Sequence, residues 1–145
     1  MLYLLSSYEK QLAKTIKIWT YVKLYTMSEE FIAIATQEIN DELAEIDSTL
    51  NSCNNDKQVY ENSKKIQTHT HKIKGLAPMM GKEALGEVCV GLDLIMKKII
   101  DGKKPEGIYE ILSESLPQMK DSMNEPNRDL SKITEKISNF ESTLS

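Results

Sequence analysis

The chain has 145 residues, of which 40% are hydrophobic and 28% are charged, with only 6 Gly and 4 Pro. These values are typical of one soluble globular domain, and the scarcity of Gly and Pro favours helices over sheets. The formal net charge of −4 argues against nucleic acid as a partner, because phosphate backbones bind basic surfaces.

No apolar run approaches the length of a transmembrane helix, so we expect no membrane insertion. The two cysteines, Cys53 and Cys89, have neither CxxC nor metal-site spacing. Unpaired thiols suit a reducing compartment, and we therefore expect a cytoplasmic protein.

Residues 1–26 are predicted to form an extra amphipathic helix outside the main domain, which we place at residues 27–145. Apolar residues recur there every three or four positions: Leu5, Tyr8, Leu12, Ile16, Trp19 and Val22. Four Lys and one Glu give the segment a basic character. We expect the stripe to pack on the other helices or on a second copy of itself. A membrane-surface helix is the alternative, because basic helices with Trp and Tyr bind bilayer surfaces.

The main domain begins with a long predicted helix. Thr26-Met27-Ser28-Glu29 fits the capping-box pattern, and an apolar stripe continues to about residue 52. The next helix is expected at about residues 57–77, capped by Asn55. Pro78 should end it, because proline cannot donate a backbone hydrogen bond.

The buried stripe of this helix is predicted to be Val59, Ile66, Ile73, Leu76 and Met80, with Thr70 near the same side. His69 is expected to be a partly buried structural residue, and His71 should lie off the stripe on the solvent side.

Three more helices are expected in the rest of the chain. One covers about residues 82–101 and is expected to bury Leu85, Val88, Leu92, Ile95 and Ile99. The next begins near Pro105 and should bend at Pro117. The last begins near Pro126 and carries a heptad-like apolar seam. The sequence thus predicts an all-α protein: an antiparallel up-down four-helix bundle with an additional N-terminal helix and a C-terminal helix.

The central stretch combines residue types that suit phosphoryl chemistry. It reads His71-Lys72-Ile73-Lys74-Gly75, followed by Ala77 and Gly81. On a helix, residues three and four positions apart share a face, so Lys74 and Gly75 lie beside the ring of His71. A neutral imidazole is nucleophilic near pH 7, a lysine offsets phosphoryl charge, and glycine leaves the approach open.

This pattern resembles the signature of histidine-containing phosphotransfer (HPt) domains, a family that includes the N-terminal domain of CheA-type chemotaxis histidine kinases. The resemblance covers roughly Met27 to Met123. It implies that His71 accepts a phosphoryl group and that Lys74 stabilises it. The surface around the ring is then expected to include four further residues, namely Gln67, Thr68, Lys72 and Gly75.

In CheA-type relatives, a glutamate on the following helix orients the histidine ring with the help of a second histidine. The resemblance places Asp93 at the glutamate position and Val90 at that of the second histidine. Asp93 is one methylene shorter than glutamate, and Val90 cannot form a hydrogen bond. Asp93 is therefore the candidate ring-orienting residue, and the kinase-specific network differs from that of the family.

The resemblance implies a phosphorelay protein of a two-component system, with a chemotaxis-like pathway as one option. Its partners would be a histidine kinase and a response-regulator receiver domain. The chain has no room for an ATP-binding kinase domain, so we expect a phosphoryl carrier without a cofactor of its own. ATP and Mg²⁺ would belong to the partner proteins.

Two other interpretations stay open. The chain could be a non-catalytic helical interaction module, with a homodimer formed through its terminal helices. His69-Thr70-His71 could also bind a metal if the segment were a strand, where alternate residues share a face. On a helix the two rings point about 200° apart, so we expect no metal site.

Overall fold

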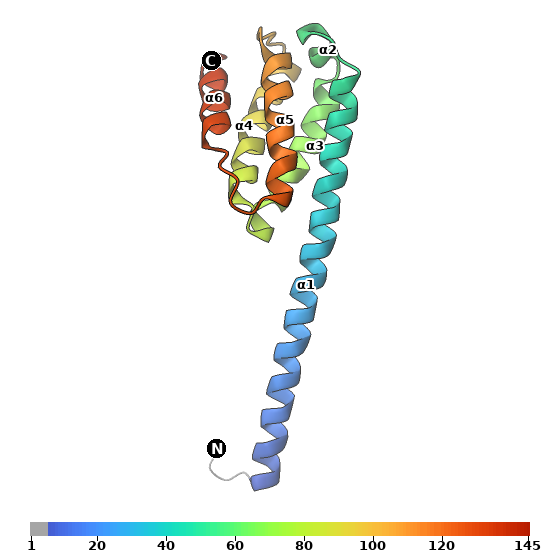
Figure 1. Ribbon diagram of the computed structural model, residues 1–145, viewed down its shortest axis with the longest axis vertical. Coiled ribbons are helices and arrows are strands. Elements are labelled where there is room, and N and C mark those ends of the chain that lie inside the picture. The colour runs from blue at the N-terminus through green and yellow to red at the C-terminus, as the bar shows by residue number, and fades with distance from the viewer. Residues whose placement is uncertain (1–5) are drawn as a thin grey trace. The chain divides into compact units, whose positions relative to one another are not determined.

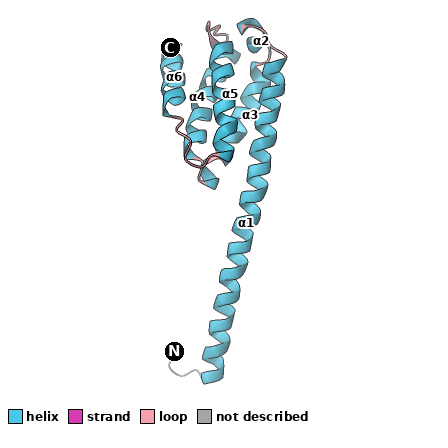
Figure 2. Cartoon of the chain, in the orientation of Figure 1, coloured by secondary structure: helices cyan, strands magenta, loops and turns pink. Residues whose placement is uncertain are grey.

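The computed structural model describes residues 6–145, except for the side chains of residues 24–27. All regular structure in this part of the chain is helical, which confirms the all-α expectation (Figure 2). In chain order, the helices labelled in Figure 1 are α1 (Ser7–Asn51), α2 (Asp56–Glu61), α3 (Ser63–Leu76), α4 (Glu83–Ile100), α5 (Ile108–Asn124) and α6 (Ser131–Ser142). A short 3₁₀ helix, η2 (Pro78–Met80), follows α3.

The predicted helix start at Thr26 is wrong, because α1 is continuous from Ser7 to Asn51. Neither Gly nor Pro occurs between these two residues, so nothing in the sequence interrupts the helical hydrogen bonds. A capping box needs a residue that leaves the helical conformation, and here the preceding residues are already helical. Leu5 and the side chains of Thr26 and Met27 lie outside the described part of the chain.

The chain divides into two compact units, residues 1–34 and 35–145, which are described separately here. The division falls later than the predicted domain boundary at residue 26. Within residues 6–34, the large apolar side chains outside residues 24–27 are exposed, with Tyr8 at 76% and Trp19 at 69%.

The second unit has a continuous apolar core to which α1 and α3–α6 all contribute. The α1 side chains in this core are Ile39, Leu43, Ile46 and Leu50. Helix α4 packs against α3, α5 and α6, so it lies at the centre of the unit. The residues that the sequence predicts as the buried face of α4 are all buried: Leu85, Val88, Leu92, Ile95 and Ile99.

The single helix predicted at about residues 57–77 is divided at Asn62 into α2 and α3. The side-chain amide of Asn62 donates to the carbonyl of Gln58 at 2.8 Å, and such local bonds compete with helix propagation. The predicted cap is confirmed, because the Asn55 side chain accepts the N–H of Gln58 at 3.0 Å. The predicted end is also confirmed: α3 stops before Pro78, and Gly81 adopts a left-handed φ of 81°.

The last helix begins at Ser131 rather than near Pro126. Asp129 accepts the N–H of Ser131, the first residue of α6, at 2.9 Å, which satisfies one of the N–H groups that a helix leaves unpaired at its start. The predicted seam faces the core, since Leu130, Ile133 and Ile137 are buried. Pro117 lies inside α5, and a bend there stays a prediction.

Helices α4 and α6 approach closely at Gly91, where a Cβ atom would lie 2.5 Å from Cγ2 of Ile137. We expect Gly91→Ala to destabilise the protein by about 1–2 kcal/mol, because the overpacking cost exceeds the gain in helix propensity. Gly75→Ala is the matched control, since no atom lies within 4 Å of its added Cβ. Gly75→Ala should stabilise by up to about 1 kcal/mol. Urea unfolding followed by circular dichroism measures both, and equal stability of Gly91→Ala and the wild type would contradict the close packing.

Candidate functional site

Helix α3 buries one face and exposes His71 on another. Ile66, Thr70 and Ile73 have no exposed surface, as the predicted stripe requires. The side chain of His71 is 57% exposed. The sequence-based placement of His71 off the buried stripe is therefore confirmed.

Asp93 of α4 is the buried centre of a polar cluster next to His71. Its side chain is 1% exposed and accepts hydrogen bonds from Nε2 of Gln67 at 2.9 Å and Nζ of Lys74 at 2.8 Å. A second lysine, Lys97, places its Nζ 3.0 Å from Oδ2. The structure thus brings together Gln67, Lys74 and Asp93, three of the residues singled out from the sequence.

Lys97 is the member of this cluster that the sequence analysis missed. A signal for it exists, because Lys97 follows Asp93 by four residues and such pairs meet on one helix face. Two ammonium groups thus share one carboxylate oxygen, Oδ2 of Asp93.

The ring of His71 approaches the other oxygen of the same carboxylate. Nδ1 lies 3.6 Å from Oδ1 of Asp93, which is longer than a hydrogen bond but within reach of an electrostatic interaction. Because Nδ1 is the nitrogen nearest the carboxylate, Nε2 lies on the opposite side of the ring. The geometry therefore distinguishes the two ring nitrogens.

The cluster holds Asp93 in its charged form. Burial raises the pKa of Asp93, but hydrogen bonds from Lys74, Lys97 and Gln67 outweigh burial and lower the pKa to about 2, from an ordinary value of 3.8. The carboxylate is therefore ionised at neutral pH and can keep both lysines in place.

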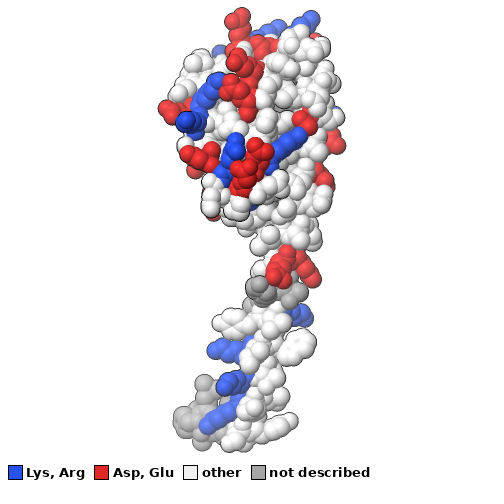
Figure 3. Space-filling view, viewed as in Figure 1, with Lys and Arg blue, Asp and Glu red and all other residues white. Residues whose placement is uncertain are grey.

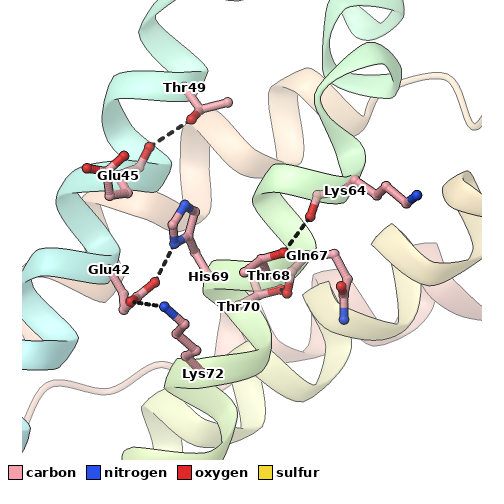
Figure 4. A network of polar contacts seen from close by, with 9 residues as sticks. All are labelled: Glu42, Glu45, Thr49, Lys64, Gln67, Thr68, His69, Thr70 and Lys72. Atoms are coloured by element: carbon pink, nitrogen blue, oxygen red, sulfur yellow. Dashed lines mark hydrogen bonds and ion pairs between the residues drawn. The ribbon is translucent and has the colours of Figure 1, made fainter.

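A second cluster lies on the other side of α3, around Glu42 of α1 (Figure 4). Glu42 is 5% exposed and interacts with Nδ1 of His69 and, at 2.9 Å, with Nζ of Lys72. Burial raises the pKa of Glu42, while the bonds from Lys72 and His69 lower it, with a net result below the ordinary value. His69 is only 13% exposed, which confirms its prediction as a partly buried structural residue.

The two clusters follow one sequence pattern, a histidine with a lysine three residues later. His69 and Lys72 bind Glu42, whereas His71 and Lys74 approach Asp93. Lys72 is thus held at Glu42, on a different side of α3 from Asp93. What separates the two histidines is exposure, because only the ring of His71 is open to a second molecule.

The remaining predicted surface residues surround His71 on α3. Gly75 is exposed, and a Cβ atom there would meet nothing within 4 Å. Thr68 is exposed and donates its hydroxyl to the carbonyl of Lys64 at 3.0 Å. Val90 and Leu94 of α4 add exposed apolar surface in the helix that carries Asp93.

The metal alternative required His69 and His71 on the same face of a strand. The segment is helical, and the two rings lie against carboxylates of different helices. Among the described residues, no group of three or more potential ligands is arranged to hold a metal ion.

Comparison of the chain with protein-family models, with curated proteins and with solved structures gave no match. Among the described residues, no helix has an apolar stretch long enough to cross a bilayer.

The shifted pKa of Asp93 predicts a stability change in acid. A carboxyl group whose pKa is lower in the folded state stabilises the fold above its unfolded value, here about 3.8, and loses this contribution as the pH falls through about 2. The shift corresponds to about 2 kcal/mol. Asp93→Asn should therefore be less stable than the wild type by about that amount at pH 7, and the difference should vanish near pH 2.

Urea unfolding from pH 7 to pH 2 measures this difference. Glu87→Gln removes an exposed carboxylate from the same helix and controls for the loss of one negative charge. A constant difference between Asp93→Asn and the wild type at all pH values would show that the lysine cluster does not stabilise the ionised carboxylate.

Proposed function

We propose that this chain is a histidine phosphotransfer protein of a two-component phosphorelay. His71 accepts a phosphoryl group from a histidine kinase and passes it to an aspartate of a receiver domain. The observation that carries the proposal is the exposed ring of His71 beside a buried carboxylate that holds two lysines. The resemblance of the central stretch to HPt domains points to the same function.

The proposal includes a four-helix bundle as the scaffold. Its helices would be residues 35–51 of α1 together with α3, α4 and α5, with α6 packed on α4 as an addition. Support comes from the shared core of these helices and from the position of α4 against α3, α5 and α6. In such a bundle, the outer face of α3 stays accessible to a protein partner.

The reaction uses Nε2 of His71 as the nucleophile. In the neutral ring, a proton on Nδ1 faces Asp93, and the lone pair on Nε2 attacks the phosphorus atom of the donor. The bond between phosphorus and its leaving group breaks as the N–P bond forms. The ring gains positive charge in this step, which the nearby carboxylate of Asp93 stabilises.

Lys74 and Lys97 supply positive charge that stabilises the transferred phosphoryl group. Two ammonium groups face one carboxylate, so one positive charge in the cluster exceeds what Asp93 neutralises. This surplus attracts phosphoryl oxygens, and the interaction is stronger where water is partly excluded. Lys74 is only 28% exposed, so its charge is less screened than that of a free surface lysine.

Both partners are proteins and need a clear approach to the ring. Gly75 leaves open space beside His71, and Val90 and Leu94 offer apolar surface to a docking domain. The kinase contributes ATP, and the receiver contributes its aspartate and Mg²⁺. A relay with these partners belongs in the cytoplasm.

Phosphorylation by potassium phosphoramidate tests the carrier without a kinase. The wild type should gain one phosphoryl group that is stable in base and labile in acid, as expected for an N–P bond. His71→Gln should gain none, whereas His69→Gln, the matched control, should be labelled like the wild type. Intact-mass spectrometry measures the modification, and equal labelling of wild type and His71→Gln would exclude His71 as the carrier and leave the non-catalytic helical module.

Transfer from phosphorylated His71 to a Mg²⁺-loaded receiver domain tests the role of Lys74. Loss of one charge-assisted hydrogen bond of about 1.5 kcal/mol corresponds to roughly a tenfold change in rate. Lys74→Ala should therefore slow the acceptance and transfer of the phosphoryl group about tenfold. Folding should be retained, because Gln67 and Lys97 still bind Asp93.

Lys72→Ala is the control, since that lysine binds Glu42 on another side of α3. It should leave the rate unchanged. Equal rates in Lys74→Ala and the wild type would remove Lys74 from the mechanism, although His71 could still be the carrier.

A further inference from the structure

The N-terminal part of α1 carries an exposed apolar stripe with the spacing of a coiled-coil seam. Tyr8, Leu12, Thr15, Trp19 and Val22 alternate at intervals of four and three residues. All five are exposed, and large apolar side chains at regular intervals are unusual on a surface that contacts only water.

The polar member of this stripe, Thr15, is compatible with a dry interface. Its hydroxyl donates to the carbonyl of Gln11 at 3.0 Å, within the same helix. Because the Thr15 hydroxyl already has a hydrogen-bond partner in its own helix, the methyl group can face an apolar partner at no further cost.

Three of the four lysines of this segment lie away from the stripe. At 100° per residue, Lys10, Lys14 and Lys17 project about half a turn from the direction of Leu12 and Trp19. Figure 3 shows basic side chains along this segment, with uncharged surface beside them. Positions that flank the stripe hold one acidic and one basic residue, Glu9 and Lys23, together with Gln11, Ile16 and Ile18.

The positions of the lysines indicate whether a membrane surface or a second copy of the chain covers the apolar stripe. A helix that binds an anionic bilayer needs lysines at the borders of its apolar face, whereas these three lysines would point away from the lipid. In a pair of identical helices, the same lysines lie outside the seam and avoid like-charge repulsion. A second copy also offers a self-complementary stripe, as a two-fold symmetric interface requires.

We propose that residues 8–22 of α1 pair with the same segment of a second copy of this chain, with Leu12 and Trp19 as the apolar anchors. The pairing covers the exposed stripe and leaves the lysine face in solvent. It does not depend on the proposed phosphotransfer function.

The full chain should be a dimer in size-exclusion chromatography with light scattering. Trp19 is the only tryptophan, so its fluorescence reports directly on the interface and should shift to shorter wavelength as the protein concentration rises. Leu12→Glu places a charge in the seam and should weaken the dimer by about 100-fold or more. Lys14→Glu is the matched control: it introduces the same residue two positions later, on the opposite side, and should stay dimeric.

Circular dichroism and urea unfolding of both variants show whether the protein stays folded. A wild type that is monomeric at all concentrations would overturn the proposal, and so would a Leu12→Glu variant that dimerises normally. Equal disruption by Lys14→Glu would also overturn it. A monomer whose Trp19 fluorescence shifts only with vesicles of phosphatidylserine and phosphatidylcholine would assign the stripe to a membrane surface instead.

Discussion

The buried carboxylate of Asp93 is the constraint on which the site depends. A charge with 1% exposure costs several kcal/mol unless it is paired and hydrogen-bonded. Gln67 and Lys74 of α3 and Lys97 of α4 provide these partners, so satisfying Asp93 sets the register of α3 against α4. The same register brings Nδ1 of His71 to 3.6 Å from the carboxylate. Stability and the placement of the ring thus have one physical cause.

Helix α3 uses the same side-chain pattern twice with different results. His69 and Lys72 meet Glu42 of α1, and His71 and Lys74 meet Asp93 of α4. The first histidine is largely covered, which suits a structural link between α1 and α3. The second is open to solvent, which suits exchange with another molecule. Two residues along a helix rotate a side chain by about 200°, and this rotation alone separates a structural histidine from a candidate reactive one.

The apolar residues of α1 also differ in burial from one part of the helix to the other. From Ala35 onward its apolar residues enter the core of the second unit, where Ile39 and Leu43 are almost fully buried. In residues 6–23 and 28–34 the apolar residues are exposed, although the helix itself continues without a break. A continuous helix can therefore contribute to a core over one part of its length and present a separate surface over another.

The sequence by itself determined the all-α class, the buried faces of α3 and α4, the end of α3 at Pro78 and the exposure of His71. These follow from periodicity and from proline and glycine, which act within a few residues along the chain. Sequence reasoning failed where local signals compete: Thr26 does not start a helix because its surroundings are already helical, and Asn62 interrupts one through a bond to Gln58. The spacing of Lys97, four residues after Asp93 on one helix, is a short-range signal that the sequence analysis missed. Only the tertiary structure showed that Lys74 meets Asp93 and that Lys72 is held at Glu42. These two contacts depend on which helices lie side by side, and no short-range pattern of residues encodes that.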